Sequence, residues 1–215
     1  MLLGLLVVVP QALWAADLPL WSVPAGFVLT PIADEARLNG QPIRMALLSG
    51  VMDPRSFQQA MERQCNSEHG DFHQAMLGSK TLWSCLHGDR YSQTLQWRQE
   101  GNRIVGELST LRLDGGKQEP HPLPLLVPEA QILSDLETRD GSQQGRVVLA
   151  QSRLSIPQLR AVLLREAHAQ GWRLEVSLSA QLRRLSLRKS RQALDIALDP
   201  LPLGGSRAIL VWQDR

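Results

Sequence analysis

Cysteine and histidine residues gather in one short part of the sequence, and these side chains can bind a metal. Cys65, His69 and His73 follow one another at intervals of four residues, and Cys85 precedes His87 by two. Thiolate sulfur and imidazole nitrogen are ligands that suit zinc or copper. One interpretation is therefore a periplasmic metal-binding protein that uses His69, His73 and His87.

Two features of the same segment favour another interpretation, in which the histidines lie in loops. Gly70 interrupts the helical spacing between His69 and His73, so the two rings need not share a helix face. The thiols are also expected to be used in a disulfide. We therefore expect no bound metal and no other cofactor, and keep the histidine cluster as the alternative.

The two cysteines are the whole cysteine content of the chain. Residues 66–84 lie between Cys65 and Cys85, which is the spacing of neither a redox pair nor a zinc knuckle. In an oxidising compartment two such cysteines pair. We predict a Cys65–Cys85 disulfide, which would stabilise the fold by about 3 kcal/mol through the entropy of the unfolded chain.

Recognisable catalytic motifs are absent from the sequence. No G-x-S-x-G segment occurs, so no nucleophile elbow is indicated. Ser49 and Ser84 have no recognisable basic partner in their sequence context, and the adjacent acids Asp34 and Glu35 are typical of solvated charge on a loop. We expect no catalytic residue and a protein that is not an enzyme. A hydrolase with an unrecognised site is a third hypothesis.

Positive charge is concentrated in one part of the chain. Residues 145–191 contain ten Lys or Arg and two acidic residues, a net charge of +8 (10 − 2), whereas the whole chain has +2. The alternation in "RRLSLRK" predicts Leu185 and Leu187 on a helix-covered face and arginines on the other face. The candidate partner-binding residues of this basic face are Arg183, Arg184, Arg188, Lys189 and Arg191. The alternative is a solvated polar face in an arginine-rich chain.

The N-terminal sequence "MLLGLLVVVPQALWAAD" indicates export. Its uncharged apolar run from Leu2 to Leu13 ends in small residues, which is typical of a signal peptide over residues 1–16; a buried N-terminal helix is the alternative. No later segment has the roughly 18 consecutive apolar residues of a membrane helix. We expect a periplasmic or secreted protein that does not span a membrane after cleavage and does not bind nucleic acid.

The elements that must position these residues follow a clear order in the second half. "RVVLAQSR" predicts a strand, and Ser155 then caps a helix that has Pro157 in its first turn and ends at Gly171. Leu159 and Leu163 belong to the apolar stripe of this helix. "QLRRLSLRK", "QALDIALD" and "SRAILVWQ" predict three short strands.

The first half has the same predicted order. "QPIRMALLS" predicts a strand, "DPRSFQQAMERQC" predicts a helix, and "TLWSCLH", "YSQTLQWR" and "RIVGELSTLRL" predict three strands. The spacing S-x4-P also recurs, at Ser49 with Pro54 and at Ser152 with Pro157, an offset of 103 (152 − 49). We interpret the chain as a duplicated unit.

A proline-rich segment separates the two halves. "LDGGKQEPHPLPLLVPEAQ" predicts an extended connector. The expected organisation is a signal peptide (1–16), an extended N-terminal segment (17–40), a first module with the disulfide (41–113), a Pro-rich linker (114–144) and a basic second module (145–215). Each small α+β module is one helix packed on an antiparallel sheet in the order β-α-β-β-β. In the N-terminal segment, Trp21 and Phe27 could contact a partner, although for Phe27 we favour packing on its own domain.

This arrangement, over roughly residues 40–215, resembles the helix-grip pairs of outer-membrane assembly accessory factors. The resemblance concerns architecture alone and implies no site residue. We expect a non-catalytic, exported accessory or adaptor protein that binds other cell-envelope components, such as a secretion or pilus assembly complex. Its partner would be an envelope protein complex or an acidic protein surface, with anionic lipid and cell-wall polymer as further anionic candidates.

Overall fold

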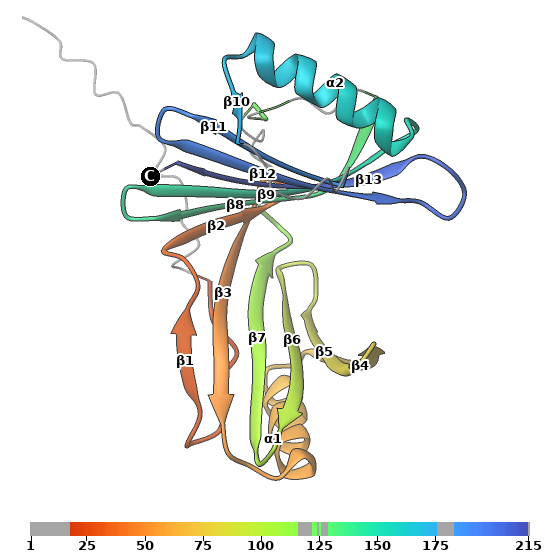
Figure 1. Ribbon diagram of the computed structural model, residues 1–215. Helices are drawn as coiled ribbons and strands as arrows, with labels where there is room; N and C mark the ends of the chain where they lie inside the picture. The colour runs from red at the N-terminus through yellow and green to blue at the C-terminus, as the bar shows by residue number, and fades with distance from the viewer. Residues whose placement is uncertain (1–17, 116–121, 124, 126–128, 176–182, 215) are drawn as a thin grey trace, which may run out of the picture.

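The computed structural model describes residues 18–115, 122–123, 125, 129–175 and 183–214. These residues form two helices and one antiparallel sheet of 13 strands (Figure 1). The fold is therefore mainly β. The prediction of two separate modules is wrong, because strands from both halves of the chain are hydrogen-bonded in a single continuous sheet. The predicted signal peptide lies outside the described residues.

The elements of the first half are β1 (Val28–Pro31), β2 (Glu35–Leu38), β3 (Gln41–Gly50), α1 (Pro54–Ser67), β4 (Asp71–Leu77), β5 (Lys80–His87), β6 (Tyr91–Glu100) and β7 (Arg103–Arg112). Those of the second half are β8 (Ala130–Asp140), β9 (Gln143–Ser152), α2 (Ile156–Ala169), β10 (Arg173–Leu174), β11 (Arg184–Lys189), β12 (Gln192–Pro200) and β13 (Ser206–Asp214). Strand β8 therefore lies within the segment that the sequence presents as a linker.

The two halves repeat one topology. In the first, the strands lie in the order β3-β7-β6-β5-β4, and in the second in the order β9-β13-β12-β11-β10. Each half thus has four strands after its helix, where the sequence predicts three. The additional strands are β4 and β10, which follow the helices directly.

The repeat extends to single positions in the helices. Both helices have 14 residues. The buried residues of α1 are Phe57, Met61 and Cys65, and those of α2 are Leu159, Leu163 and Ala167. Equivalent positions therefore differ by 102 in number (159 − 57), and not by the 103 of the S-x4-P spacing. On this count Ser152 is equivalent to Gly50, so that spacing does not mark the repeat.

The helix ends have local causes in the sequence. Asp53 caps α1, because its Oδ2 accepts a hydrogen bond of 2.9 Å from the backbone N–H of Ser56. This bond lowers the pKa of Asp53, so the cap is fully present above the ordinary pKa of an aspartate and is lost as the pH falls through the lowered value. After the helices, His69 (φ 58°) and Gly171 (φ 81°) occupy equivalent left-handed positions.

Each half buries its apolar side chains between its helix and one face of its sheet (Figure 1). The first core includes Trp21, Phe57, Trp83 and Leu95, all with no exposed surface. Phe27 stacks on Phe57 with ring centroids 4.7 Å apart, so it packs on its own half as favoured from the sequence. The second core contains Leu159, Leu163 and Trp172. We call the sheet face opposite each helix the open face of that half.

Strand β2 joins the two halves. It pairs with β3 through Arg37 and Leu38, and on its other side it pairs with β8. In the second pairing Ala36 lies opposite Thr138, which is its equivalent in the repeat (138 − 36 = 102). Equivalent strands therefore meet around a pseudo-twofold axis. The "EAR" of residues 35–37 faces the "ETR" of residues 137–139 in antiparallel register, so Glu35 pairs with Arg139.

Candidate functional site

Strand β11 presents its side chains in the alternation that the sequence predicts. Leu185 and Leu187 are each 1% exposed and belong to the core beneath α2. Arg184 and Arg188 are exposed on the open face of the second half. Between them, the Ser186 hydroxyl donates a 2.6 Å hydrogen bond to Asp195 of β12, which is the nearest acidic group in the register.

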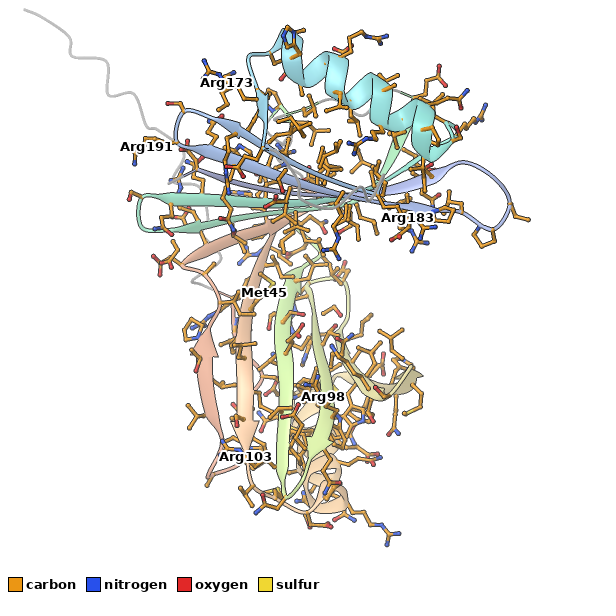
Figure 2. All side chains as sticks on the ribbon, in the orientation of Figure 1. Met45, Arg98, Arg103, Arg173, Arg183 and Arg191 are labelled. Carbon is orange, nitrogen blue, oxygen red and sulfur yellow. A yellow bond between two sulfur atoms is a disulfide. The ribbon has the colours of Figure 1, made fainter. Side chains whose placement is uncertain are left out.

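The five predicted basic residues do not form one compact patch. Arg183 and Arg191 lie at opposite ends of β11, as the labelled side chains show (Figure 2). Lys189 follows the alternation of Leu185 and Leu187, so it projects toward the helix side of the sheet. The structure brings together Arg184 and Arg188, and it separates the other three from that pair.

Arg173 joins this pair from β10 and was not predicted. It is the direct cross-strand neighbour of Arg188. Like charges in that position destabilise a sheet. The repulsion is offset by Glu175, whose carboxylate lies 3.0 Å from Nε of Arg188. The end of the second half thus has three exposed guanidinium groups, from Arg173, Arg184 and Arg188, with one close acidic partner among the ion pairs of the described residues.

The three histidines of the alternative metal site point in different directions. His73 lies on β4 next to Phe72, and because Phe72 is the cross-strand partner of buried Cys85, His73 faces the open side. His87 is 2% exposed and lies on the helix side, with Nε2 3.1 Å from Oε1 of Gln93. His69 is exposed at the end of α1. No group of three metal-binding side chains occurs within the part of the chain that the structure describes.

The predicted disulfide is confirmed. Cys65 and Cys85 are bonded, with Cα atoms 5.8 Å apart, and the bond connects α1 to β5 within the first core. Their equivalents in the second half are Ala167 and Leu187, which pack without a covalent bond. A disulfide indicates an oxidising, extracytoplasmic compartment. Among the described residues, no helix is both long and apolar enough to cross a membrane.

A buried ion pair in the second half was not predicted. Arg146 is 5% exposed and donates two hydrogen bonds to Asp135, of 2.8 Å from Nε and 2.6 Å from Nη2. Its Nη1 also donates to the carbonyl of Pro122 at 3.0 Å. Burial by itself lowers the pKa of Arg146, but the hydrogen bonds and charge of Asp135, with a smaller effect of Glu137, raise it above the ordinary value.

The equivalent residue in the first half makes the same kind of bond. Arg44 donates from Nη1 to the carbonyl of Leu18 at 2.9 Å. The segments that contain Leu18 and Pro122 each precede their half and each place a fully buried side chain in its core, Trp21 in one case and Leu125 in the other. These arginines therefore anchor the extended segments to the sheet. Trp21 is thus part of the first core and has no exposed surface.

A polar hollow of about 470 Å³ lies where the β1–β2 connection meets the β8–β9 hairpin. Its lining includes Ile32, Thr138, Asp140, Gln144 and Asp214. The two carboxylates are the charged groups of this lining, and it contains no cysteine, histidine or serine that could act as a nucleophile or base.

Comparisons of the chain with family models, with curated proteins and with solved structures give no match. The functional argument therefore depends on the fold and on the residues described above.

Proposed function

We propose that the chain is an exported, non-catalytic accessory protein of the cell envelope, which binds an acidic surface of a protein complex through the open face of its second half. A secretion or pilus assembly system is the kind of complex that we expect. The observation that carries the proposal is the exposed arginine pair on β11, Arg184 and Arg188, with Arg173 beside it. The disulfide supports the location, since it requires an oxidising compartment.

The geometry of the pair suits recognition of carboxylates. Guanidinium groups form planar, two-pronged hydrogen bonds with carboxylates, and such pairs bind more strongly than single contacts. Alternate residues of β11 point to the same face of the sheet. The side chains of Arg184, Ser186 and Arg188 therefore form a row. Ser186 donates to Asp195 within this row, and Glu175 lies 3.0 Å from Arg188, so a carboxylate of the partner would share Arg188 with Glu175.

The test is crosslinking in the producing cell, followed by identification of the crosslinked neighbours. We expect the double variant Arg184→Glu and Arg188→Glu to lose its main neighbour, with an affinity reduced about tenfold or more for the isolated complex. The binding of the wild type should also weaken as salt is raised, because exposed charges are screened. Both residues are exposed, so the variant should fold and keep its disulfide.

The chain offers a matched control in the open face of the first half. Arg98 and Arg103 are also exposed strand arginines on that face, and Figure 2 labels both. The variant Arg98→Glu and Arg103→Glu has the same change in net charge and should keep the neighbour. Equal loss in both variants would show a general charge effect, and no loss in the β11 variant would refute the proposal.

A further inference from the structure

The sheet ends in strands that differ in how well they are protected from further pairing. Strand β10, at one end, has two residues and contains Arg173. Strand β1, on the free side of β3, has four residues and ends in Pro31. Short length, charge and proline are the features by which proteins protect sheet edges. Strand β4, at the other end, has seven residues and contains no Lys, Arg or Pro.

Strand β4 has an unpaired backbone edge, and it also has exposed apolar side chains. All seven residues pair with β5 without a register shift, and no described residue pairs with the opposite side. Met76 is 65% exposed and Leu77 is 57% exposed. An edge of this length, without lysine, arginine or proline, is a template for one more strand.

We propose that β4 pairs with β4 of a second copy of this chain, in an antiparallel arrangement centred on Gln74. Gln74 is the midpoint of Asp71–Leu77, so this register uses the whole strand. It places Asp71 opposite Leu77 of the second copy, Phe72 opposite Met76, and His73 opposite Ala75. Gln74 meets its own symmetry mate on the twofold axis.

This register brings apolar side chains together on the helix side and opposes no like charges. Phe72 and Met76 both lie on the helix side, since Phe72 is opposite Cys85, and their pairing would cover the exposed methionine twice. On the open side, Leu77 lies opposite Lys80 within one copy. The ammonium group of Lys80 points away from β4, because it donates to Gln96 of β6 at 2.8 Å and lies 3.9 Å from Glu107 of β7. Asp71 of the second copy therefore lies beside Leu77 at the margin of the interface, and no like charges face each other in this register.

The chain already contains one pairing of this kind. Strands β2 and β8 are equivalent in the repeat, and they pair antiparallel around a pseudo-twofold axis through Ala36 and Thr138. In that pairing Glu35 of one strand lies opposite Arg139 of the other. The fold thus accepts the pairing of equivalent edges, which is the contact that a symmetric dimer requires.

The experiment measures self-association of the full exported chain by sedimentation equilibrium over a wide range of protein concentration. Interfaces of this small class are weak, so we expect a dimer with Kd on the order of 10–100 µM. Gln74→Lys places two like charges directly opposite each other on the axis and should raise Kd on the order of tenfold or more, and Gln74→Glu should do the same.

A mixture of the two variants separates this pairing from other causes. Gln74→Lys loses the hydrogen bond that Gln74 Oε1 accepts from Gln58 Nε2, whereas Gln74→Glu keeps an acceptor for it, and in the mixture the lysine of one variant meets the glutamate of the other across the axis. An equimolar mixture should therefore recover a dimer that contains one copy of each. Thr30→Lys, on the free edge of β1, is the control and should dimerise like the wild type.

Three results would overturn the proposal. They are a wild-type chain that stays monomeric at about 500 µM, a dimer that Gln74→Lys leaves unchanged, and a mixture of the two variants that stays monomeric. The first result would instead favour pairing of β4 with an extended segment of another protein. The arginines of β11 lie at the far end of the sheet, so this test is independent of the proposed function.

Discussion

The buried pair of Arg146 and Asp135 shows how far a single residue depends on distant context. Both side chains are about 5% exposed, and removing two charges from water is costly unless each is well hydrogen-bonded. Here Nε and Nη2 of Arg146 each donate a hydrogen bond to one carboxylate oxygen of Asp135, and the carbonyl of Pro122 accepts a third hydrogen bond. The pair therefore holds β8, β9 and the segment of Pro122 in one arrangement.

We predict that Asp135→Ala lowers the free energy of unfolding by about 3–5 kcal/mol, because it leaves a buried guanidinium without its main partner. The double variant Asp135→Leu with Arg146→Met should lose much less, since it removes both charges and keeps apolar volume. Urea unfolding followed by circular dichroism measures both. A double variant less stable than Asp135→Ala would contradict this account.

Some of these residues were predictable from the sequence and others were not. The disulfide follows from two cysteines and an expected export signal, and the positions of Arg184 and Arg188 follow from strand alternation around Leu185 and Leu187. Arg146 lies in the apolar run "RVVLA", and its partner comes from a segment that prolines mark as a linker. Such a contact depends on strand pairing across β8 and β9, which local sequence does not specify.

The same distinction holds for whole elements. Both helices and the strands β3, β5, β6, β7, β9, β11, β12 and β13 correspond to the predicted segments. Strand β4 was missed because "DFHQAML" is an edge strand with most residues exposed, so its sequence lacks the alternation of a half-buried strand. Strand β10 is too short to leave a pattern.

Comparison of the two halves indicates that the disulfide of the first half takes the place of packed side chains in the second. In the second half Ala167 and Leu187 occupy the positions of the two cysteines, and Trp172 occupies the position of Gly70. A Cβ on Gly70 would lie 2.4 Å from Sγ of Cys85, so the sulfur atoms use the space near the helix end. The second half fills the corresponding space with a large side chain.

We predict that Cys65→Ala with Cys85→Leu, which copies the second half, folds and loses about 3 kcal/mol relative to the oxidised wild type. Cys65→Ala with Cys85→Ala should lose about 1–2 kcal/mol more, because a cavity remains. Denaturant unfolding of the two variants gives the difference directly. If both variants had the same stability, the two sites would not be equivalent in packing.

For the whole molecule, the decisive contact is the pairing of β2 with β8. It comprises four residue pairs, from Glu35 with Arg139 to Leu38 with Leu136. These pairs join two helix-covered sheets into one. The sequence predicts each helix-covered sheet but not the pairing between them, so it indicates two separate modules. Nothing in the local sequence shows which edges meet, because edge pairing depends on the shape of both completed halves.

We predict that Arg37→Pro uncouples the two halves. Asn39 donates its backbone N–H to the carbonyl of Asp135 across this pairing, so by strand alternation the N–H of Arg37 also points toward β8, and proline removes this donor. Thermal unfolding should then occur in two steps, with one step sensitive to reduction of the disulfide in the first half. Thr30→Pro, which removes a donor from the pairing of β1 with β3 instead, is the control and should keep a single transition. A single shared transition in Arg37→Pro would show that the halves are coupled elsewhere.

The distance along the chain between β2 and its partner has a consequence for biogenesis. Ribosomes synthesise the N-terminus first, so residues 35–38 are made about a hundred positions before residues 136–139. Cys65 and Cys85 can be oxidised during that interval, before β8 is available to pair with β2. We therefore expect oxidation to precede the closing of the sheet.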